Sequence, residues 1–481
     1  MAETSVHGAI HRECSAPPLS RRDLISGLPD AMIHNIFSFL PIHDVVKTCV
    51  LSKRWRPTWT TATDLVFVGY DVYFEPPPDS PLFFPSIVDS VLSQFSSPTV
   101  KKFHLTRFMY DEADRPKIDL WLRFAVRRSV EDLRLRLSQW SRFFYVLPEF
   151  LYCFSRLVRL DVGKCCFSLD MTIRWPCLKV LSIEDAQLSD DFLGRIFRGC
   201  PVLESLVLSR CEGVNNIIID SLCLKKLVLV SLGFGSYVKK LCAPHLLSLR
   251  VIGGNHAGFR LDNVSSLVEA DLDFSVESRD PNSKGRDLLR HLLEKVRGVP
   301  TITTGGWCLQ VLSLLEMDGV PSPLSKCQNL ILHAPVNQWD LPGIAYMLRS
   351  SQCLEKLVIY LTCFPMVCSF AMFQLHRESE ERFNFDEEDF LCSRKGNFEC
   401  LVKHLKRVEI VGCEAYVGES KHLLALIKFL LGDALVLEKL IIKAKLPPTP
   451  DGQKQLQVIQ NVLSYQRASK NAEIVFDYHF K

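Results

Sequence analysis

At 481 residues the chain is long enough for two or more domains, or for one domain joined to a repeat array. Its 57 basic and 54 acidic residues leave a formal net charge of +3, so the composition demands neither a nucleic acid nor an anionic membrane as a partner. The N-terminus lacks the apolar core of a signal peptide and no run of 18 uncharged apolar residues occurs, so we expect no membrane span and expect the 18 cysteines to be reduced core thiols.

Residues 23–59 predict three short helices. The first helix is predicted from apolar side chains at i, i+3, i+4 and i+7, which are Ile33, Ile36, Phe37 and Leu40. Pro29 suits its start and Pro41 marks its end. A second helix is expected from about Asp44, and a third after Ser52, a typical N-cap residue. A unit this small buries little surface, so it needs a partner, or the rest of the chain, to cover its apolar faces.

This stretch resembles an F-box in its plant form, and the spacing of three motifs makes the resemblance specific: Leu28-Pro29-Asp30, Ser38-Phe39-Leu40-Pro41 and Val50-Leu51-Ser52-Lys53-Arg54-Trp55. The resemblance implies docking onto a Skp-type adaptor, which links to a cullin scaffold. The residues implied to form or support the docking surface are Leu28, Pro29, Ile33, Ile36, Leu40, Leu51 and Trp55. The alternative is that the same residues are only the core of a helical cap on the following domain.

Pro57 departs from the family pattern. With Ser52 as the N-cap, Pro57 would occupy the fifth helical position and would lack the amide hydrogen that the helix needs there. An interior proline costs about 3 kcal/mol. We therefore expect the third helix to end early or to kink, with weaker adaptor binding as a consequence.

A repeat dominates the chain after a proline-rich linker at 76–85 and a helix expected at about 86–95. Its kernel is an apolar residue at i, i+3 and i+5, and about thirteen copies begin at Val100, Val130, Leu157, Leu178, Leu203, Leu224, Leu246, Leu267, Leu309, Cys327, Leu354, Leu405 and Leu437. From the third to the eighth copy the steps are 21, 25, 21, 22 and 21 residues, within the leucine-rich-repeat range.

Each kernel predicts a short strand whose i+3 and i+5 side chains point inward. One unit cannot bury its own apolar face, so the units are expected to stack into a curved solenoid with a parallel sheet. Helices are expected between kernels at 188–199 and 287–296, and insertions or missed units at 273–305 and 363–398. These kernels resemble the plant leucine-rich repeats that follow F-boxes.

The C-terminal region, from about residue 383, changes character. It opens with an acidic run at 385–390, which we expect to be a solvated loop, the alternative being a site for a basic partner. The elements predicted after this run are a helix at 421–431, a strand at 437–442, a helix at 453–465 and a strand at 472–478. Their order, and the Arg467-Ala468-Ser469 turn before the last strand, resemble the FBD region of plant F-box proteins. The alternative is a simple end cap of the solenoid.

The fold class expected is α/β: a three-helix F-box, a leucine-rich-repeat solenoid and an FBD-type α/β cap. The predicted boundaries are a disordered leader at 1–20, the F-box at 21–67, a linker and helix at 68–97, the repeats at 98–382 and the FBD-like region at 383–481.

Candidate catalytic groups are sparse. His245, His291 and His404 are isolated, Gly233-Phe234-Gly235 lacks the further glycine of a dinucleotide loop, and no CxxC pair supports a zinc site, so we expect neither a cofactor nor a metal. Basic residues gather loosely near the second repeat, either as a solvated face or as a site for an acidic target: Arg123, Arg127, Arg128, Arg134, Arg136 and Arg142.

The resemblance implies a non-catalytic substrate-recognition subunit of an SCF-type E3 ubiquitin ligase in the cytoplasm, the nucleus or both. Its partners would be a Skp-type adaptor with its cullin, and an unknown target protein on the concave strand face of the repeats; no nucleic acid or membrane partner is expected. One alternative is a repeat scaffold that is not coupled to a ligase. Another is an enzyme of unrecognised type, which would need a pocket with paired titratable groups.

Overall fold

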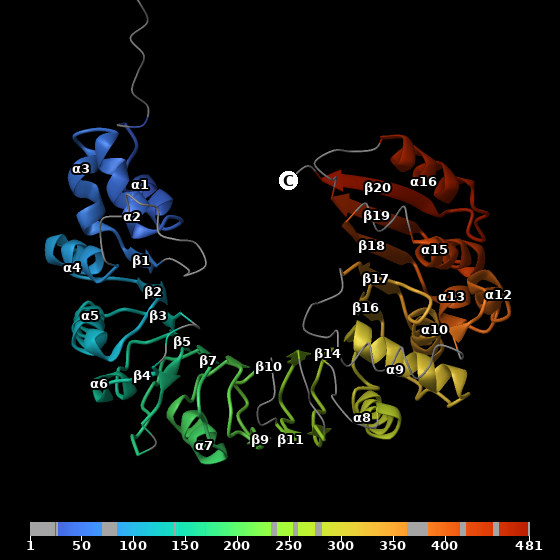
Figure 1. Ribbon diagram of the computed structural model, residues 1–481, viewed down its shortest axis with the longest axis horizontal. Coiled ribbons are helices and arrows are strands. Elements are labelled where there is room, and N and C mark those ends of the chain that lie inside the picture. The colour runs from blue at the N-terminus through green and yellow to red at the C-terminus, as the bar shows by residue number, and fades with distance from the viewer. Residues whose placement is uncertain are drawn as a thin grey trace, which may run out of the picture.

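The chain forms an open arc in which strands line the inner side and helices lie mostly on the outer side (Figure 1). The computed structural model describes residues 25, 27–69, 84–138, 141, 143–168, 170–231, 238–253, 258–274, 281–362, 383–413, 420–445 and 452–479. The predicted leader at 1–20, the linker prolines at 76–81, the glycines of 233–235, Arg142 and most of the expected insertion at 363–398 lie outside the described residues.

The inner side is one parallel sheet whose strands are ordered by sequence, each beside the next repeat's strand. Its 15 described strands are β1 (Asp64–Val68), β2 (Lys102–Phe108), β3 (Asp132–Leu137), β5 (Arg159–Gly163), β7 (Val180–Glu184), β8 (Ser205–Ser209), β10 (Lys226–Ser231), β12 (Ser248–Gly253), β14 (Glu269–Phe274), β15 (Thr301–Gly305), β16 (Asn329–His333), β17 (Lys356–Tyr360), β18 (Arg407–Cys413), β19 (Lys439–Lys445) and β20 (Glu473–His479). This stacking is the predicted solenoid.

Twelve of the thirteen predicted kernels fall on these strands, and their i+3 and i+5 side chains are buried. In β8, for example, Leu206 and Leu208 are buried while Val207 between them is partly exposed. The alternation arises because successive strand side chains point to opposite faces of the sheet. One face of each strand therefore packs beneath the outer layer, and the other faces the hollow of the arc.

The kernel predicted at Leu309 is wrong, because those residues form the helix α9 (Gly306–Met317). Ten consecutive residues of α9 are buried, from Trp307 to Glu316. A helix buried on all sides carries leucines at every spacing and so mimics a strand kernel. The strand of this repeat is β15, where Ile302 is followed at the next inward position by Thr304 instead of an aliphatic residue. The missed unit expected at 273–305 is thus a repeat with its own helix and strand.

Helices cover most of the outer side of the sheet. They are α4 (Phe84–Gln94), α5 (Arg115–Arg127), α6 (Glu149–Tyr152), α7 (Asp190–Gly199), α8 (Pro281–Lys295), α9, α10 (Leu341–Ser350), α12 (Glu387–Cys392), α13 (Glu399–Lys403), α15 (Lys421–Asp433) and α16 (Gly452–Ser464). The helices predicted at about 86–95, 188–199, 287–296, 421–431 and 453–465 are confirmed to within a few residues, apart from α8, which begins six residues before its predicted start. The strands predicted at 437–442 and 472–478 are confirmed as β19 and β20.

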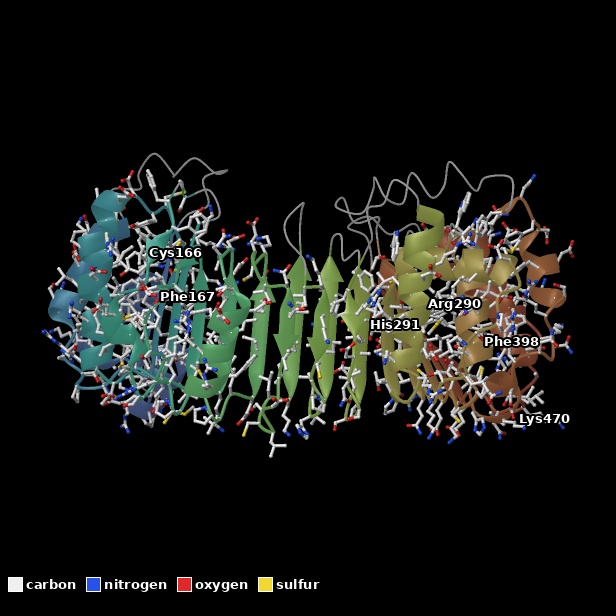
Figure 2. All side chains as sticks on the ribbon, turned by 90° about the horizontal axis from the view of Figure 1, so that it is seen from below. Cys166, Phe167, Arg290, His291, Phe398 and Lys470 are labelled. Carbon is white, nitrogen blue, oxygen red and sulfur yellow. The ribbon has the colours of Figure 1, made fainter. Side chains whose placement is uncertain are left out.

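The middle of the outer side is different. Between α7 and α8, the described residues 200–231, 238–253 and 258–274 hold strands and turns but no helix. A three-stranded parallel sheet backs the inner strands here: β9 (Asn216–Ile218), β11 (Lys240–Cys242) and β13 (Arg260–Leu261). Figure 2 looks onto this outer side and shows strands without a covering helix in the centre of the arc, with Arg290 and His291 of α8 at one border. A smaller pair, β4 (Tyr145–Val146) and β6 (Cys165–Cys166), lies nearer the N-terminal end.

The N-terminal unit sits at one end of the arc, and its helices are α1 (Asp30–Phe37), α2 (Ile42–Lys47) and α3 (Trp55–Thr58). Two 3-10 turns extend α2 and α3, at Thr48–Val50 and Trp59–Thr61. The three predicted helices are confirmed, although α2 begins two residues before Asp44.

The predicted position of Pro57 in the interior of the third helix is wrong. Because α3 begins at Trp55, Pro57 is its third residue and lies in the first turn, where amide groups have no partner within the helix. The Ser52 Oγ does accept a bond from the Trp55 amide, at 3.4 Å, but the residue at the N-cap position is Arg54. The helix is short, as expected, yet Pro57 removes no helical hydrogen bond.

Candidate functional site

The seven candidate docking residues of the N-terminal unit divide into two groups. Ile33 and Trp55 are buried in the core. Leu28 and Leu40 are partly buried, whereas three others are exposed: Pro29, Ile36 and Leu51. Only the exposed and partly buried residues can touch another protein directly, so Ile33 and Trp55 can act only as supports.

Trp55 ties this unit together. Its ring meets the Phe37 ring edge-on with centroids 5.7 Å apart, and its indole Nε1 donates to the Ile25 carbonyl oxygen at 3.2 Å. The neighbouring Arg54 donates to the Asp30 carboxylate at 2.6 Å, which joins α3 to the start of α1. These contacts hold the exposed apolar residues of α1 and of the 3-10 turn after α2 in fixed positions.

Exposed apolar side chains are concentrated here. Six of the twenty large apolar side chains that are exposed among the described residues lie between positions 25 and 51: Ile25, Met32, Ile36, Phe39, Val50 and Leu51. Phe39 is 80% exposed and Val50 is 83% exposed. An exposed apolar surface on a small unit marks an interaction site. The sequence motifs include Phe39 and Val50, but the predicted docking surface contains neither of them, nor Met32 or Ile25. The available signal was that these apolar residues lie outside the i, i+3, i+4, i+7 spacing of the helical core.

The second candidate surface is the concave face of the sheet. Strands β1 to β8 form the N-terminal arm of this face, and ion pairs link their side chains from strand to strand. Lys102 contacts Asp64 at 2.7 Å, and His104 contacts Asp132 at 3.0 Å. Further along, two arginines share one buried carboxylate: Arg134 and Arg136 reach Asp161 at 2.9 and 2.7 Å. Arg136 also contacts Glu184 at 2.7 Å.

The basic cluster seen in the sequence is therefore divided. Its members on β3 are held by carboxylates on the concave face, whereas Arg123 and Arg127 lie on α5 in the outer layer. The series of ion pairs ends at Arg210, which donates to both Glu184 and Asp185, and the bonds to Asp185 raise its pKa above the usual value. A surface whose cations are already paired offers little attraction to an acidic ligand.

The acidic run at 385–390 is not the solvated loop that the sequence predicts. Asp386 caps α12 by accepting a bond from the Asp389 amide at 3.0 Å. The acids of α12 then pair with lysines of α15: Glu387 with Lys421 at 2.9 Å and Glu388 with Lys428 at 2.7 Å. Burial is the largest single influence on Glu387 and opposes its ionisation, but the bond from Lys421, a backbone amide bond and the nearby charges of His422 and Lys421 together outweigh it and lower the pKa of that carboxyl. These acids hold two helices together instead of facing a partner.

The histidines noted in the sequence lie on separate elements: His245 in the loop before β12, His291 on α8 and His404 after α13. Within the described part of the chain, no three histidine, cysteine, aspartate or glutamate side chains gather in a metal-binding arrangement. Among the same residues, no helix is both long enough and apolar enough to cross a bilayer.

Comparison with known proteins gives three family matches in chain order. Residues 25–63 match the F-box domain, residues 118–261 match the leucine-rich repeats described as "FBD-associated F-box protein At5g56370, LRR repeats", and residues 395–442 match the FBD. The similar proteins include F-box/LRR-repeat protein At3g03360 of Arabidopsis thaliana, 32% identical over 378 residues that cover 75% of each chain. Putative F-box/LRR-repeat protein At3g18150 of the same species is 32% identical over 345 residues, 70% of this chain and 72% of the relative.

Proposed function

This chain belongs to the plant F-box/leucine-rich-repeat family with a C-terminal FBD, and from that premise we propose that it is the substrate-recognition subunit of an SCF-type E3 ubiquitin ligase. In this role the N-terminal unit binds a Skp-type adaptor, which connects it to the cullin. The repeats bind a target protein. The chain itself is non-catalytic and acts in the cytoplasm, the nucleus or both.

The observation that carries the proposal is the apolar surface of the N-terminal unit. We assign direct adaptor contacts to the exposed and partly buried candidates: Leu28, Pro29, Ile36, Leu40 and Leu51. Ile33 and Trp55 support this surface from the core. Phe39 and Val50 join the contact set because they are more exposed than the four leucine and isoleucine candidates. Fully burying one such aliphatic or aromatic side chain contributes about 1.5–3 kcal/mol, so a handful of them is enough for a stable complex.

The contribution of the chain to ubiquitin transfer would be proximity. A target held in the hollow of the arc keeps its lysines at high effective concentration near the ubiquitin thioester carried by the enzymes that the cullin recruits. Figure 1 has the N-terminal unit and the C-terminal strands on opposite sides of that hollow, an arrangement that supports simultaneous binding of adaptor and target.

The alternative function, a repeat scaffold that is not coupled to a ligase, is no longer favoured by any specific residue. That alternative depended on Pro57 disrupting the third helix, and Pro57 lies in the first turn, where a proline is tolerated.

The test is a binding measurement between the purified full chain and a Skp-type adaptor. We expect Leu51→Asp, which places a charge in the interface at a 51% exposed position, to weaken binding at least about tenfold. The double variant Leu28→Ala/Pro29→Ala should weaken it as well. The matched control is Leu324→Asp, at a 62% exposed leucine outside the N-terminal unit, which should bind like the wild type. Absence of adaptor binding by the wild-type chain would refute the proposal, and so would Leu51→Asp binding like the control.

A further inference from the structure

Strands β15 to β20 form the C-terminal arm of the concave face. This arm carries a partly apolar surface that the N-terminal arm lacks. The register from β16 to β19 forms two rows on this face: Ile331, Val358, Glu409 and Ile441 in one, and His333, Tyr360, Val411 and Lys443 in the next. We call the six members other than Glu409 and Lys443 the Tyr360 patch; among them Val358 is buried, and Glu409 separates it from Ile441. In one row Ile331 lies opposite Val358. In the next row His333 lies opposite Tyr360, and Tyr360 opposite Val411. Strands β16 to β19 line the hollow of the arc (Figure 1), and the patch residues alternate with the buried residues of these strands, which places them on the hollow side.

Tyr360 is the anchor of the patch. It is 41% exposed, although the neighbouring inward residue Ile359 is fully buried. Its ring meets the His333 ring edge-on with centroids 5.2 Å apart. His333 is in turn fixed by Asp273, whose Oδ2 lies 3.3 Å from the imidazole Nδ1. A tyrosine that is held in place and partly exposed, here between His333 and Val411, is the type of residue that dominates binding at protein interfaces.

Charged side chains flank and interrupt the patch, and most of them are basic. Strands β17 to β19 present four described cations to the concave side, Lys356, Arg407, Lys439 and Lys443, and one carboxylate, Glu409. Glu409 is buried and receives Lys356 at 2.8 Å and Lys443 at 3.3 Å. Lys439 contacts Glu473 of β20 at 3.3 Å.

Arg407 takes no part in these ion pairs. It is exposed, and the described residues place no carboxylate within ion-pair distance of it. Along the strand it lies four residues before Val411, or about 13 Å at the rise of a β-strand. A peptide of about five residues in extended conformation can therefore reach from Arg407 to the Tyr360 ring.

The N-terminal arm has the opposite character. Arg134 and Arg136 are held by Asp161 and Glu184, and the facing strands present mostly charged and small polar side chains. A ligand there would have to break existing ion pairs before it formed its own. The C-terminal arm offers apolar surface and an available cation without that cost.

We propose that the Tyr360 patch is the target-docking site, and that it takes an extended segment with an apolar side chain packed on Tyr360 and a carboxylate, about four residues away, paired with Arg407. This inference specifies the target class for the function proposed above and rests on it. It places recognition on β16 to β19 and assigns the ion-paired arginines of the N-terminal arm a structural role.

The test is a selection from a random peptide library displayed on phage, with the immobilised full chain as bait. We expect enriched peptides that combine apolar residues with an acidic residue. Tyr360→Ala and Arg407→Glu should each weaken the best peptide at least about tenfold. A selection repeated on Arg407→Glu should enrich a basic residue in place of the acidic one. The matched control is Lys226→Glu, at an exposed lysine on β10 with no described carboxylate partner, which should bind the peptide like the wild type.

Three results would overturn the docking site: no enriched peptide, enriched peptides without an acidic residue, or binding that is lost in Arg134→Ala and retained in Tyr360→Ala and Arg407→Glu. The selection needs no adaptor, so its outcome is separate from that of the adaptor-binding measurement. A chain that selects peptides and fails to bind the adaptor would keep the Tyr360 patch and lose the ligase role.

Discussion

Glu316 joins the last repeats to the C-terminal region through a buried ion cluster. Its side chain is 1% exposed, it accepts a bond from Arg349 of α10, and it contacts the Arg394 Nε after α12 at 3.2 Å. Glu316→Ala leaves two arginines without this carboxylate. Removing one partner of a buried ion pair costs about 3–5 kcal/mol. Because both arginines are partly exposed and can regain water, we expect the lower end, about 3 kcal/mol, in the local unfolding of α9 and α10.

The assay is hydrogen exchange of the α9 and α10 amides, because a solenoid unfolds locally and a global midpoint would dilute the effect. A loss of about 3 kcal/mol corresponds to exchange that is faster by roughly two orders of magnitude where exchange reports the opening equilibrium. The matched control is Glu204→Ala, which removes a pair with Lys179 at 2.9 Å in which both side chains are 53% exposed. It should cost less than about 1 kcal/mol for its own repeat. Equal effects of the two variants, each on its own repeat, would refute the argument from burial.

Three further predictions concern buried or crowded positions. Asp340 is fully buried before α10 and burial raises its pKa to about 7, so stability should fall as pH rises from about 4 to 7, by up to about 3 kcal/mol, and Asp340→Asn should flatten that slope in urea titrations. Gly305→Ala would place a Cβ 1.6 Å from Asp273 Oδ1, displacing that side chain from His333 and costing about 1–3 kcal/mol in urea unfolding. Asp161→Asn should release its arginines and move elution from a heparin column to higher salt.

Each of these has an opposing result. The pH argument fails if Asp340→Asn keeps the wild-type slope between pH 4 and 7. The steric argument fails if Gly305→Ala unfolds at the wild-type urea concentration. The pairing argument fails if Asp161→Asn elutes with the wild type, or if a surface control, Glu204→Gln, shifts as much as Asp161→Asn.

The periodicity of the repeats made most of the fold predictable. Leucines at i, i+3 and i+5 identify strands such as β8 and β12 because the inward positions of a stacked strand must be apolar. The same rule failed at Leu309, where a helix buried on all sides produced the spacing, and it missed β15, where Thr304 occupies an inward position. Tertiary burial, which no local pattern reports, decided both cases.

The candidate surfaces were predictable only in part. The motif around Trp55 located the N-terminal unit, but the division into buried supports and exposed contacts required the packing of Trp55 against Phe37. The arginines of β3 looked like a free basic site because the carboxylates that hold them come from neighbouring repeats, 25 or more residues away in sequence. Tyr360 gave no sequence signal, since its setting depends on strands that meet only through the stacking of repeats.

The strand-backed middle of the arc has a consequence for reach. Inner strands are spaced about 4.8 Å apart, whereas packed helices need about 8–10 Å. A repeat backed by a helix is therefore wider on its outer side than on its inner side, and the solenoid curves at that repeat. A repeat backed by β9, β11 or β13 has nearly equal spacing on its inner and outer sides, so it adds little curvature to the solenoid. Adding or deleting one unit there would slide the C-terminal arm by about 5 Å relative to the N-terminal unit with little change in its orientation. The same change beside α5 or α15 would swing the arm, so the middle of the arc is where the distance between the two ends can be adjusted independently of their angle.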